Sequence, residues 1–332
     1  MKIEKILWYG LEAVLLETNV YEAILVPSMG ANLIKLYNKE KQVDILRTPT
    51  EDDIETFLSR PQVFGTPLLF PPNRIEDGKY TFAGKSYEYP ITIPAQNNYH
   101  HGIIKSQPFS ITRTRFSDDA VEVECSFFSN RINDAIYANF PHEFVCKMRY
   151  ILTDNELTQI VTFTNLGTSP MPLGVGYHTP IRLPFSSNTN KDDYKLRLSA
   201  GKHWELSDRS LPTGQLLDLS EEESLLCSEG LSPIGKPIEI ALTNKAILDN
   251  GKPYHGAILT DTKNNISVYY EVDSQFKHWT LWNNGGEVDW VCPEPQTWAI
   301  NAPNLNLPKE VTGLQTVGAG KSWSGTTRFY VK

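Results

Sequence analysis

Cysteine is scarce in this sequence, and the cysteines that occur are far apart. The four of them stand at positions 125, 146, 227 and 292, and they form neither a CxxC pair nor a Cys/His spacing typical of zinc sites. Neither a disulfide framework nor a zinc site is indicated. We therefore expect four buried, reduced thiols.

Long hydrophobic runs are missing as well. No stretch approaches the roughly 20 apolar residues that a membrane-spanning helix needs. Glu12 interrupts the apolar run over residues 6–16, and no small-residue cleavage site follows it. The sequence therefore predicts neither a membrane partner nor a signal peptide, and we expect a soluble, cytoplasmic protein.

Positive charge is not in excess. The chain has 31 Lys and Arg residues against 39 Asp and Glu residues, a net charge of −8 at pH 7, and no basic run offsets this balance. A protein that binds by neutralising phosphates needs the opposite balance. We therefore expect no nucleic-acid partner, which leaves neutral small molecules or other proteins.

Helical signals are also few. The one fair candidate covers residues 51–60, where Thr50 can act as an N-cap, acidic residues fill the first turn and Pro61 stops the helix. This pattern predicts a short helix that is too small to found a helical domain.

Strand signals, in contrast, recur along the whole chain. Apolar and polar residues alternate over residues 121–127, 194–198 and 266–272, and turn signals such as Asp249-Asn250-Gly251 separate such stretches. Strands with one buried and one wet face are typical of antiparallel sheets. The chain has 332 residues, 40% of them hydrophobic, and no linker or repeat. These features predict one all-β, mostly antiparallel domain over residues 1–332, a sandwich or a closed barrel, with residues 216–235 as a surface excursion.

Two histidine positions have suggestive neighbours. His178 follows Gly174 and Gly176, which allow a close backbone approach, so we expect it at a strand end. There its imidazole could donate a proton to a weakly basic oxygen near neutral pH. His100 and His101 are adjacent, and neighbours on an extended strand point to opposite faces. We therefore do not expect them to bind one metal ion.

Glu294 is the second candidate for chemistry, because it stands between Pro293 and Pro295. We expect a stiff loop after an apolar strand over residues 288–291, holding one carboxylate for chemistry; an ion pair at a loop is the alternative. Tryptophans cluster nearby, and indole rings stack well on sugars. We expect most of them in the core and one, at most two, against a ligand: Trp279, Trp282, Trp290 and Trp298.

In order and spacing, several short motifs resemble the aldose 1-epimerase (galactose mutarotase) family. The resemblance covers roughly residues 3–330 and includes Pro72-Asn73-Arg74-Ile75, His101-Gly102, Gly176-Tyr177-His178-Thr179-Pro180, Leu248-Asp249 and Pro293-Glu294-Pro295-Gln296. It implies a large β-sandwich of the galactose mutarotase type with few short helices, whose concave face holds a free sugar.

The resemblance also implies roles for six residues. Glu294 resembles the general base on the anomeric hydroxyl, and His178 resembles the general acid toward the ring oxygen. The other four resemble substrate-binding residues: Arg74 and His101, which hydrogen-bond the sugar or its ring oxygen, Asp249, which holds other hydroxyls, and Asn73, which orients the site.

Exchange of anomers needs only two groups of opposite function. One removes the proton from O1 while the other adds a proton to O5, so that the ring opens to the aldehyde. The C1–C2 bond then rotates, and the ring closes from the other face. A carboxylate and an imidazole suffice, so we expect neither a metal nor a cofactor.

The segments that follow His178 and Leu248 are less aromatic and less apolar than the family pattern, which leaves the sugar open. One alternative is a hexose-6-phosphate epimerase in which Arg60 or Arg182 holds the phosphate. Another is a noncatalytic carbohydrate-binding protein, although a binder does not need both Glu294 and His178. A lyase or glycosidase comes third, because no carboxylate partner for Glu294 is evident. A monomer and a homodimer both fit the sequence.

Overall fold

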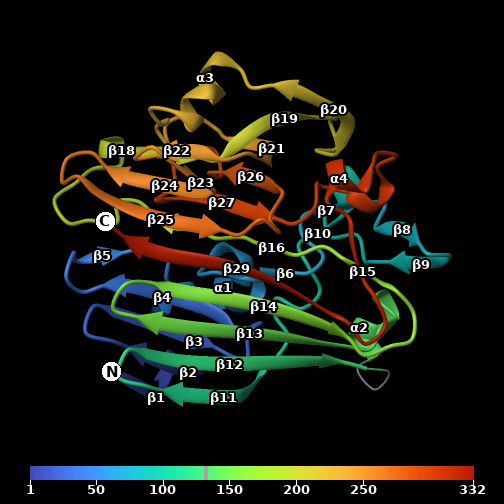
Figure 1. Cartoon of the computed structure of the whole chain (residues 1–332), viewed down its shortest axis with the longest axis horizontal. Helices are drawn as coiled ribbons and strands as arrows, with labels where there is room; N and C mark the ends of the chain where they lie inside the picture. The colour runs from blue at the N-terminus through green and yellow to red at the C-terminus, as the bar shows by residue number, and fades with distance from the viewer. Residues whose placement is uncertain (131–133) are drawn as a thin grey trace.

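The structure is a computed structural model that describes residues 1–130 and 134–332. Within these residues, antiparallel strands form three large sheets, with two-stranded ribbons at their margins (Figure 1). The helices are short and lie between strands: α1 (Ile54–Ser59), α2 (Asp134–Asn139), α3 (Glu221–Ser224) and α4 (Lys309–Thr312). Single 3-10 turns accompany them: η1 (Glu51–Asp53), η2 (Pro61–Val63), η3 (Pro94–Gln96), η4 (Lys191–Asp193), η5 (Leu225–Cys227) and η6 (Ala302–Asn304).

The three large sheets are named A, B and C in the order in which the chain enters them. Sheet A holds, side by side, β1 (Lys2–Trp8), β2 (Leu11–Glu17), β3 (Tyr21–Val26), β4 (Asn32–Asn38) and β5 (Val43–Asp44). Sheet B runs in the order β11 (Ser110–Phe116), β12 (Ala120–Ser129), β13 (Phe144–Thr153), β14 (Leu157–Asn165), β29 (Ser322–Val331), β25 (Ile266–Val272), β24 (Gly256–Asp261) and β18 (Tyr194–Leu198).

Sheet C carries the site described below. Its order is β20 (Pro212–Asp218), β19 (Ala200–Leu206), β21 (Glu239–Asn244), β26 (His278–Trp282), β27 (Trp290–Gln296), β16 (Gly176–Tyr177) and β6 (Leu68–Leu69), with β17 (Ile181–Arg182) also paired to β27. The ribbons are β7 (Arg74–Glu76) with β10 (Asn98–His100), β8 (Lys79–Phe82) with β9 (Lys85–Glu88), β15 (Met171–Leu173) with β28 (Gln315–Val317), and β22 (Ile247–Asp249) with β23 (Lys252–Tyr254).

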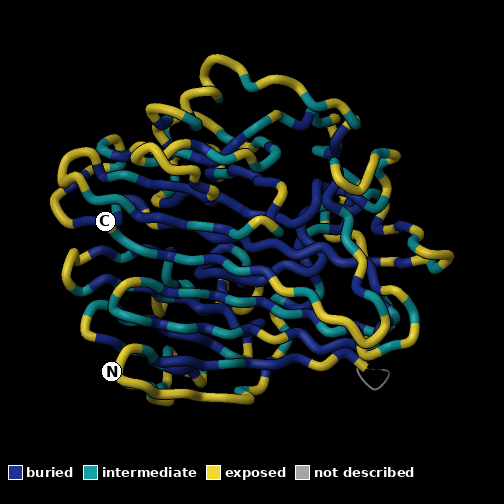
Figure 2. Tube along the Cα trace, viewed as in Figure 1, coloured by how far each residue is buried: buried dark blue, intermediate teal, exposed yellow. Residues whose placement is uncertain are grey.

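One continuous core joins the three sheets. It includes Leu25 of sheet A, Val161 of sheet B and Leu281 of sheet C, each fully buried. In Figure 2 the buried residues follow the middle of the strands, and the exposed residues gather at the turns. The strand orders are linear rather than closed. The fold is therefore a sandwich, and the barrel alternative is wrong.

Alternation along the strands explains this burial. In β12, Val121, Val123 and Cys125 are fully buried toward the core. Glu122 on the opposite face is only 5% exposed, so the expectation of a fully wet face is wrong there. Its carboxylate accepts a hydrogen bond of 2.6 Å from Arg149 on β13, and this ion pair covers it.

Local expectations from the sequence are mostly confirmed. Residues 51–60 form η1 followed by α1, and Pro61 begins the next 3-10 turn. All four cysteines are free, but Cys227 is only half-buried, which corrects the expectation of four buried thiols. In the described part of the chain, no helix is both long and apolar enough to cross a membrane.

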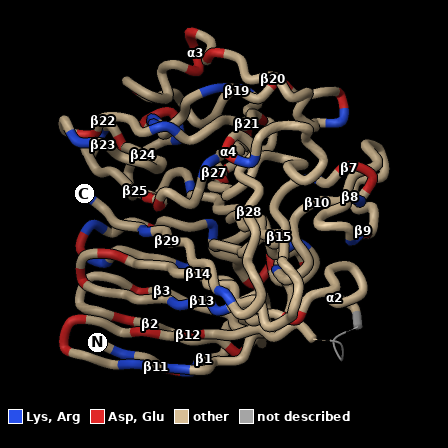
Figure 3. The backbone as a smooth tube through the Cα atoms, turned by 45° about the vertical axis from the view of Figure 1, so that its right-hand side comes forward, with Lys and Arg blue, Asp and Glu red and all other residues tan. Residues whose placement is uncertain are grey.

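Acidic and basic residues are interspersed along the outer strands rather than gathered by sign (Figure 3). Lys147 on β13, for example, pairs with Glu124 on β12 at 3.3 Å. Surface charge of this mixed kind offers no broad electrostatic patch on these strands.

Candidate active site

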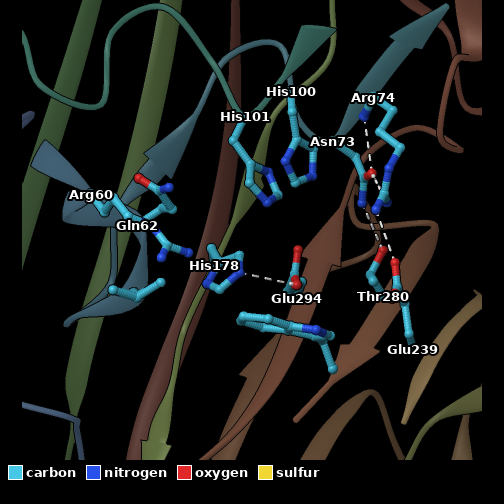
Figure 4. Close-up of a pocket in the computed structure, with 12 residues that line it drawn as sticks. Arg60, Gln62, Asn73, Arg74, His100, His101, His178, Glu239, Thr280 and Glu294 are labelled. Carbon is cyan, nitrogen blue, oxygen red and sulfur yellow. Dashed lines mark hydrogen bonds and ion pairs between the residues drawn. The ribbon is translucent and has the colours of Figure 1, made fainter. Parts of the chain in front are cut away.

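A cavity of about 270 Å³ opens on sheet C, lined by residues from segments far apart in the sequence (Figure 4). The lining comes from the turn between α1 and η2, from the β7/β10 ribbon, from the chain after β16, and from β21, β26 and β27. The lining residues are Arg60, Gln62, Val63, Asn73, Arg74, His100, His101, His178, Glu239, Thr280, Trp282 and Glu294.

Glu294 lines this cavity and is only 2% exposed. Its Oε2 atom has no hydrogen-bond partner among the described residues. Burial raises the pKa of this carboxyl well above its usual value, and the nearby Glu239 charge raises it further, while Arg74 and a hydrogen bond from Gln296 oppose the rise. A ligand hydroxyl in the cavity would give Oε2 the partner that it lacks.

Glu294 belongs to a strand and not to the loop that the sequence suggested. It pairs with Thr280 across β26–β27. On its other side, β27 pairs with β17 at Val291 and with β16 at Gln296, and between these two points no described residue pairs with it on that side. The flanking prolines fall in this gap, where the strand has one neighbour and an amide N–H would have no strand to bond.

His178 enters beside this gap, directly after β16. Its Nε2 atom is 3.4 Å from Glu294 Oε1, and its Nδ1 atom is 3.1 Å from the sulfur of Cys292 (Figure 4 shows the first contact). The side chain is 3% exposed. Burial lowers the pKa of His178 to about 3. Considered apart from proton exchange with Glu294, the His178 side chain is therefore neutral at pH 7.

The two glycines before His178 have the role expected of them. A Cβ atom on Gly174 would lie 2.2 Å from the ring of Trp298, and one on Gly176 would lie 2.9 Å from Cβ of Pro72. Trp298 is therefore a core residue, as are Trp279 and Trp290, whereas Trp282 lines the cavity. One of the four tryptophans faces the pocket, and its contact with a ligand stays a prediction.

Arg74 and Asn73 line the opposite wall of the cavity from Gln62 (Figure 4). Arg74 donates to Glu239 Oε1 at 2.9 Å and to Asn73 Oδ1 at 3.3 Å. Asn73 has a left-handed backbone, φ 56°, and its amide donates to Thr280 Oγ1 at 3.0 Å. These bonds fix both side chains beside Glu294 before any ligand arrives.

His100 and His101 both line the cavity, contrary to the expectation that neighbours point apart. His101 is not extended: its φ is 64°, and the following Gly102 has φ 75°. The two rings consequently stack, with centroids 3.4 Å apart. His101 also meets the ring of His178 edge-on at 5.0 Å, and its Nδ1 atom has no partner among the described residues.

The structure does not bring Asp249 to this site. Asp249 ends β22 in the β22/β23 ribbon, where it accepts a hydrogen bond of 3.2 Å from Arg197 and one of 3.3 Å from Tyr269. These partners hold the carboxylate against sheet B, so its expected contact with sugar hydroxyls in the pocket is corrected. The second carboxylate in the lining is Glu239.

Sequence reasoning missed Glu239, Thr280 and Gln62. Glu239 is flanked by Ile238 and Ile240, an alternation that predicts a strand and turns the glutamate to the other face. Nothing in that pattern distinguishes a cavity from open solvent. Thr280 has the clearer signal, because it faces Glu294 once β26 and β27 are paired.

Among the described residues, His101, His178 and Glu294 form the one group whose side chains could together approach a metal ion. One ligand atom from each lies within 4.8 Å of the others. A tetrahedral site also needs a fourth ligand, and the described residues place only these three ligand groups together. We assign no ion to it.

Fold and site together define a β-sandwich protein with a buried carboxylate and imidazole facing one small polar pocket. The family model described as aldose 1-epimerase matches residues 12–330. The chain belongs to the aldose 1-epimerase family.

Known relatives agree with this assignment. Galactose mutarotase of Bos taurus is 24% identical over 165 residues, which is 50% of this chain and 45% of that protein. The match thus spans about half the length of that curated relative.

Among solved structures, a galactose mutarotase-like protein from Clostridium acetobutylicum is 35% identical, with a TM-score of 0.97 and coverage of 100% of this chain and 98% of that one. A galactose 1-epimerase from Lactobacillus acidophilus, 14% identical with a TM-score of 0.73 over 100% and 98% of the two chains, shares the fold.

Proposed function

We propose that this protein is an aldose 1-epimerase that interconverts the α and β anomers of a free hexose. Glu294 takes the proton from O1 while His178 gives the proton on Nε2 to O5, and the C1–O5 bond breaks. The open-chain aldehyde rotates about C1–C2. As the ring closes on the other face, Glu294 gives its proton to O1 and His178 takes the proton back from O5.

The observation that supports this proposal is the 3.4 Å separation of His178 Nε2 and Glu294 Oε1 on one cavity wall. O1 and O5 are both bonded to C1, so an acid and a base must lie close together to reach both oxygens at once. A carboxylate and an imidazole in contact satisfy this condition. A noncatalytic sugar-binding protein has no need of such a pair.

Burial helps the reaction in a specific way. The pair holds one proton in both states: an ion pair when the closed sugar is bound, and a neutral carboxyl with a neutral imidazole when the ring is open. Burial raises the pKa of Glu294 and lowers that of His178, and both shifts favour the neutral state. The site therefore favours the proton positions that accompany ring opening.

Polarimetry with Glu294→Gln tests the proposal. We expect the wild-type protein to accelerate mutarotation of α-glucose or α-galactose, and the variant to lose about 10²-fold or more in kcat while calorimetry still detects the sugar. Glu271→Gln is the matched control, because Glu271 pairs with Arg328 at 2.7 Å and does not line the cavity. Equal turnover by wild type and Glu294→Gln would remove Glu294 from the mechanism.

A second candidate is an epimerase for hexoses with an anionic group on C6, such as a 6-phosphate. Arg60 lines the cavity, forms no ion pair among the described residues, and its charge lowers the pKa of His178. If His178 protonates O5, a cation on its side of the pocket is close to C5 and hence to the C6 substituent. Arg182, the other candidate, is engaged by Asp44 at 2.7 Å.

The same assay separates the two candidates when free hexose and hexose 6-phosphate are compared. Under the second candidate, Arg60→Gln raises KM for the phosphate at least about tenfold and leaves the free sugar unaffected, and Arg182→Gln changes neither. Turnover of the phosphate alone would reject the free-sugar proposal. Turnover of the free sugar alone would reject the second candidate.

A further inference from the structure

One strand contacts both nitrogens of His178. Cys292 and Glu294 are two residues apart on β27, so their side chains emerge on the same face. The Cys292 sulfur is 3.1 Å from Nδ1, and Glu294 Oε1 is 3.4 Å from Nε2. Nε2 is thus the nitrogen at the reacting carboxylate, and Nδ1 is turned away from it.

Cys292 is fully buried and does not line the cavity, so it has no direct contact with a ligand there. Burial, and then the charge of Glu294, raise the pKa of its thiol well above the usual value, while the Thr179 backbone opposes this with a hydrogen bond to the sulfur. The side chain is therefore a neutral thiol, and its sulfur already accepts a hydrogen bond.

The proposed reaction uses only Nε2 as the site of proton exchange. For Nε2 to give and regain its proton, Nδ1 must keep its own proton throughout, and that proton needs an acceptor. Cys292 is the partner that the structure gives to Nδ1. We propose that Cys292 is a positioning residue whose sulfur accepts the Nδ1 proton of His178 and so holds the neutral imidazole with a free Nε2 toward Glu294.

A thiol suits this position better than a carboxylate. A carboxylate beside Nδ1 would stabilise the imidazolium and raise the pKa of His178. A neutral sulfur is a weak acceptor, which orients the ring without adding charge. His178 can then release its proton easily in the buried site. This inference rests on the proposed function, because it assigns proton exchange to Nε2.

Long-range proton–nitrogen correlation spectra of protein carrying nitrogen-15 histidine test the proposal directly. The chain has seven histidines, and His178→Asn identifies the signals of His178. We expect a protonated Nδ1 in the wild type, although a free neutral imidazole side chain prefers the proton on Nε2. Cys292→Ala should shift the proton to Nε2, and Cys292→Ser should keep it on Nδ1. An unprotonated Nδ1 in the wild type overturns the proposal.

Kinetics give the second measurement. Loss of one orienting hydrogen bond should lower kcat of Cys292→Ala about tenfold with KM changed less than twofold, because Cys292 does not touch the sugar. Cys292→Ser should recover most of the rate. Cys146→Ala is the matched control, since Cys146 is equally buried on β13 and outside the cavity lining. Equal kcat for Cys292→Ala and Cys146→Ala also overturns the proposal.

The two measurements distinguish failure of the proposed function from failure of the role assigned to Cys292. If no sugar is epimerised by the wild type, the proposed function is wrong, yet the position of the Nδ1 proton in the wild type and in Cys292→Ala still decides the role of Cys292. If sugar is epimerised and the spectra show Nδ1 unprotonated, only the role of Cys292 is wrong.

Discussion

The pKa values of Glu294 and His178 are shifted in opposite directions by the same cause, burial. Burial disfavours charge on either group, so it raises the pKa of Glu294 and lowers that of His178 to about 3. In contact, the two titrate as a pair rather than as separate groups. In the proposed mechanism the pair is active with one proton, because it then holds both an acid and a base.

This coupling predicts an unusual pH dependence of kcat/KM. The pair gains its second proton only far below the ordinary histidine value of about 6.5, so we expect less than about a twofold loss of enzymatic rate as pH falls from 7.5 to 5.5. As pH rises through the raised pKa of Glu294, the pair loses its last proton and the rate falls. Polarimetry, corrected for uncatalysed mutarotation at each pH, measures both limbs. A rate that rises with pH around a midpoint near 6.5 would contradict the coupled pair.

The carboxylates Glu294 and Asp249 show what can and cannot be predicted for single residues from the sequence. Glu294 is marked by its prolines, and the structure places it in the pocket beside His178, Arg74, His101 and Asn73. Asp249 follows an equally plausible motif but bonds to Arg197 and Tyr269 elsewhere. Which carboxylate reaches the pocket depends on how β21 and the β22/β23 ribbon lie in space. A local pattern does not contain that information.

At the scale of elements, the short turn at His101-Gly102 brings two histidines into one wall. An extended backbone would have sent the rings to opposite faces. The left-handed φ of His101 reverses this, and Gly102 follows with φ 75° where a Cβ atom would lie 2.7 Å from the Phe70 backbone nitrogen. Sequence periodicity predicts strands and their faces, but a residue with positive φ breaks the period without an evident signal.

Gly102→Ala should therefore disturb both the fold and the site. The added methyl group meets a backbone atom and imposes strain at positive φ, so we expect about 1 to 3 kcal/mol of lost unfolding free energy and a several-fold rise in KM as His101 moves. Urea denaturation and polarimetry measure the two effects. Gly84→Ala is the control, because Gly84 has φ 77° but nothing within 4 Å of the added atom. Equal effects in both variants would show that strain alone, and not the contact with Phe70, is responsible.

β27 shows how an element and a site depend on one another. The prolines beside Glu294 suggested a loop, because a proline inside a sheet removes a ladder hydrogen bond. The strand nevertheless continues to Gln296, because β26 pairs with it on one side and the prolines fall where the other side has no paired strand among the described residues. His178 occupies the space beside that gap. The prolines can be read from the sequence. The gap in strand pairing cannot, because it depends on where β16 and β17 pair with β27.

At the scale of the whole molecule, the fold class was predictable because alternating stretches recur along the chain, and burial follows the alternation in strands such as β14 of sheet B. In sheet C the alternation fails, because every residue of β27 is buried. The assembly of the pocket was not predictable from spacing alone. Its lining spans residues 60–294 and comes from the segment after α1, from the β7/β10 ribbon and from sheet C. Only the family resemblance linked these segments before the structure did.

Buried histidines give the molecule a common sensitivity to acid. Four of them are at most 6% exposed: His101, His142, His178 and His278. Burial lowers the pKa of all four, to about 4 for His142 and about 3 for His178 and His278, and it lowers the pKa of the half-buried His100 as well. Unfolding returns each to about 6.5. Between these values the unfolded chain binds more protons than the folded one, so stability falls as pH falls.

We expect the unfolding free energy to drop by several kcal/mol between pH 7 and pH 5.5, at about 1 kcal/mol for each histidine, with the raised pKa of Glu294 offsetting part of the loss. Urea denaturation across this range measures the slope. His142→Gln removes one of the five, whose Nε2 atom bonds to the Tyr87 hydroxyl at 2.7 Å. By proton linkage it should make the slope shallower by about a fifth. A stability that stays level down to pH 5.5 would mean that these histidines take up protons in the folded protein. It would contradict the neutral state inferred for His178.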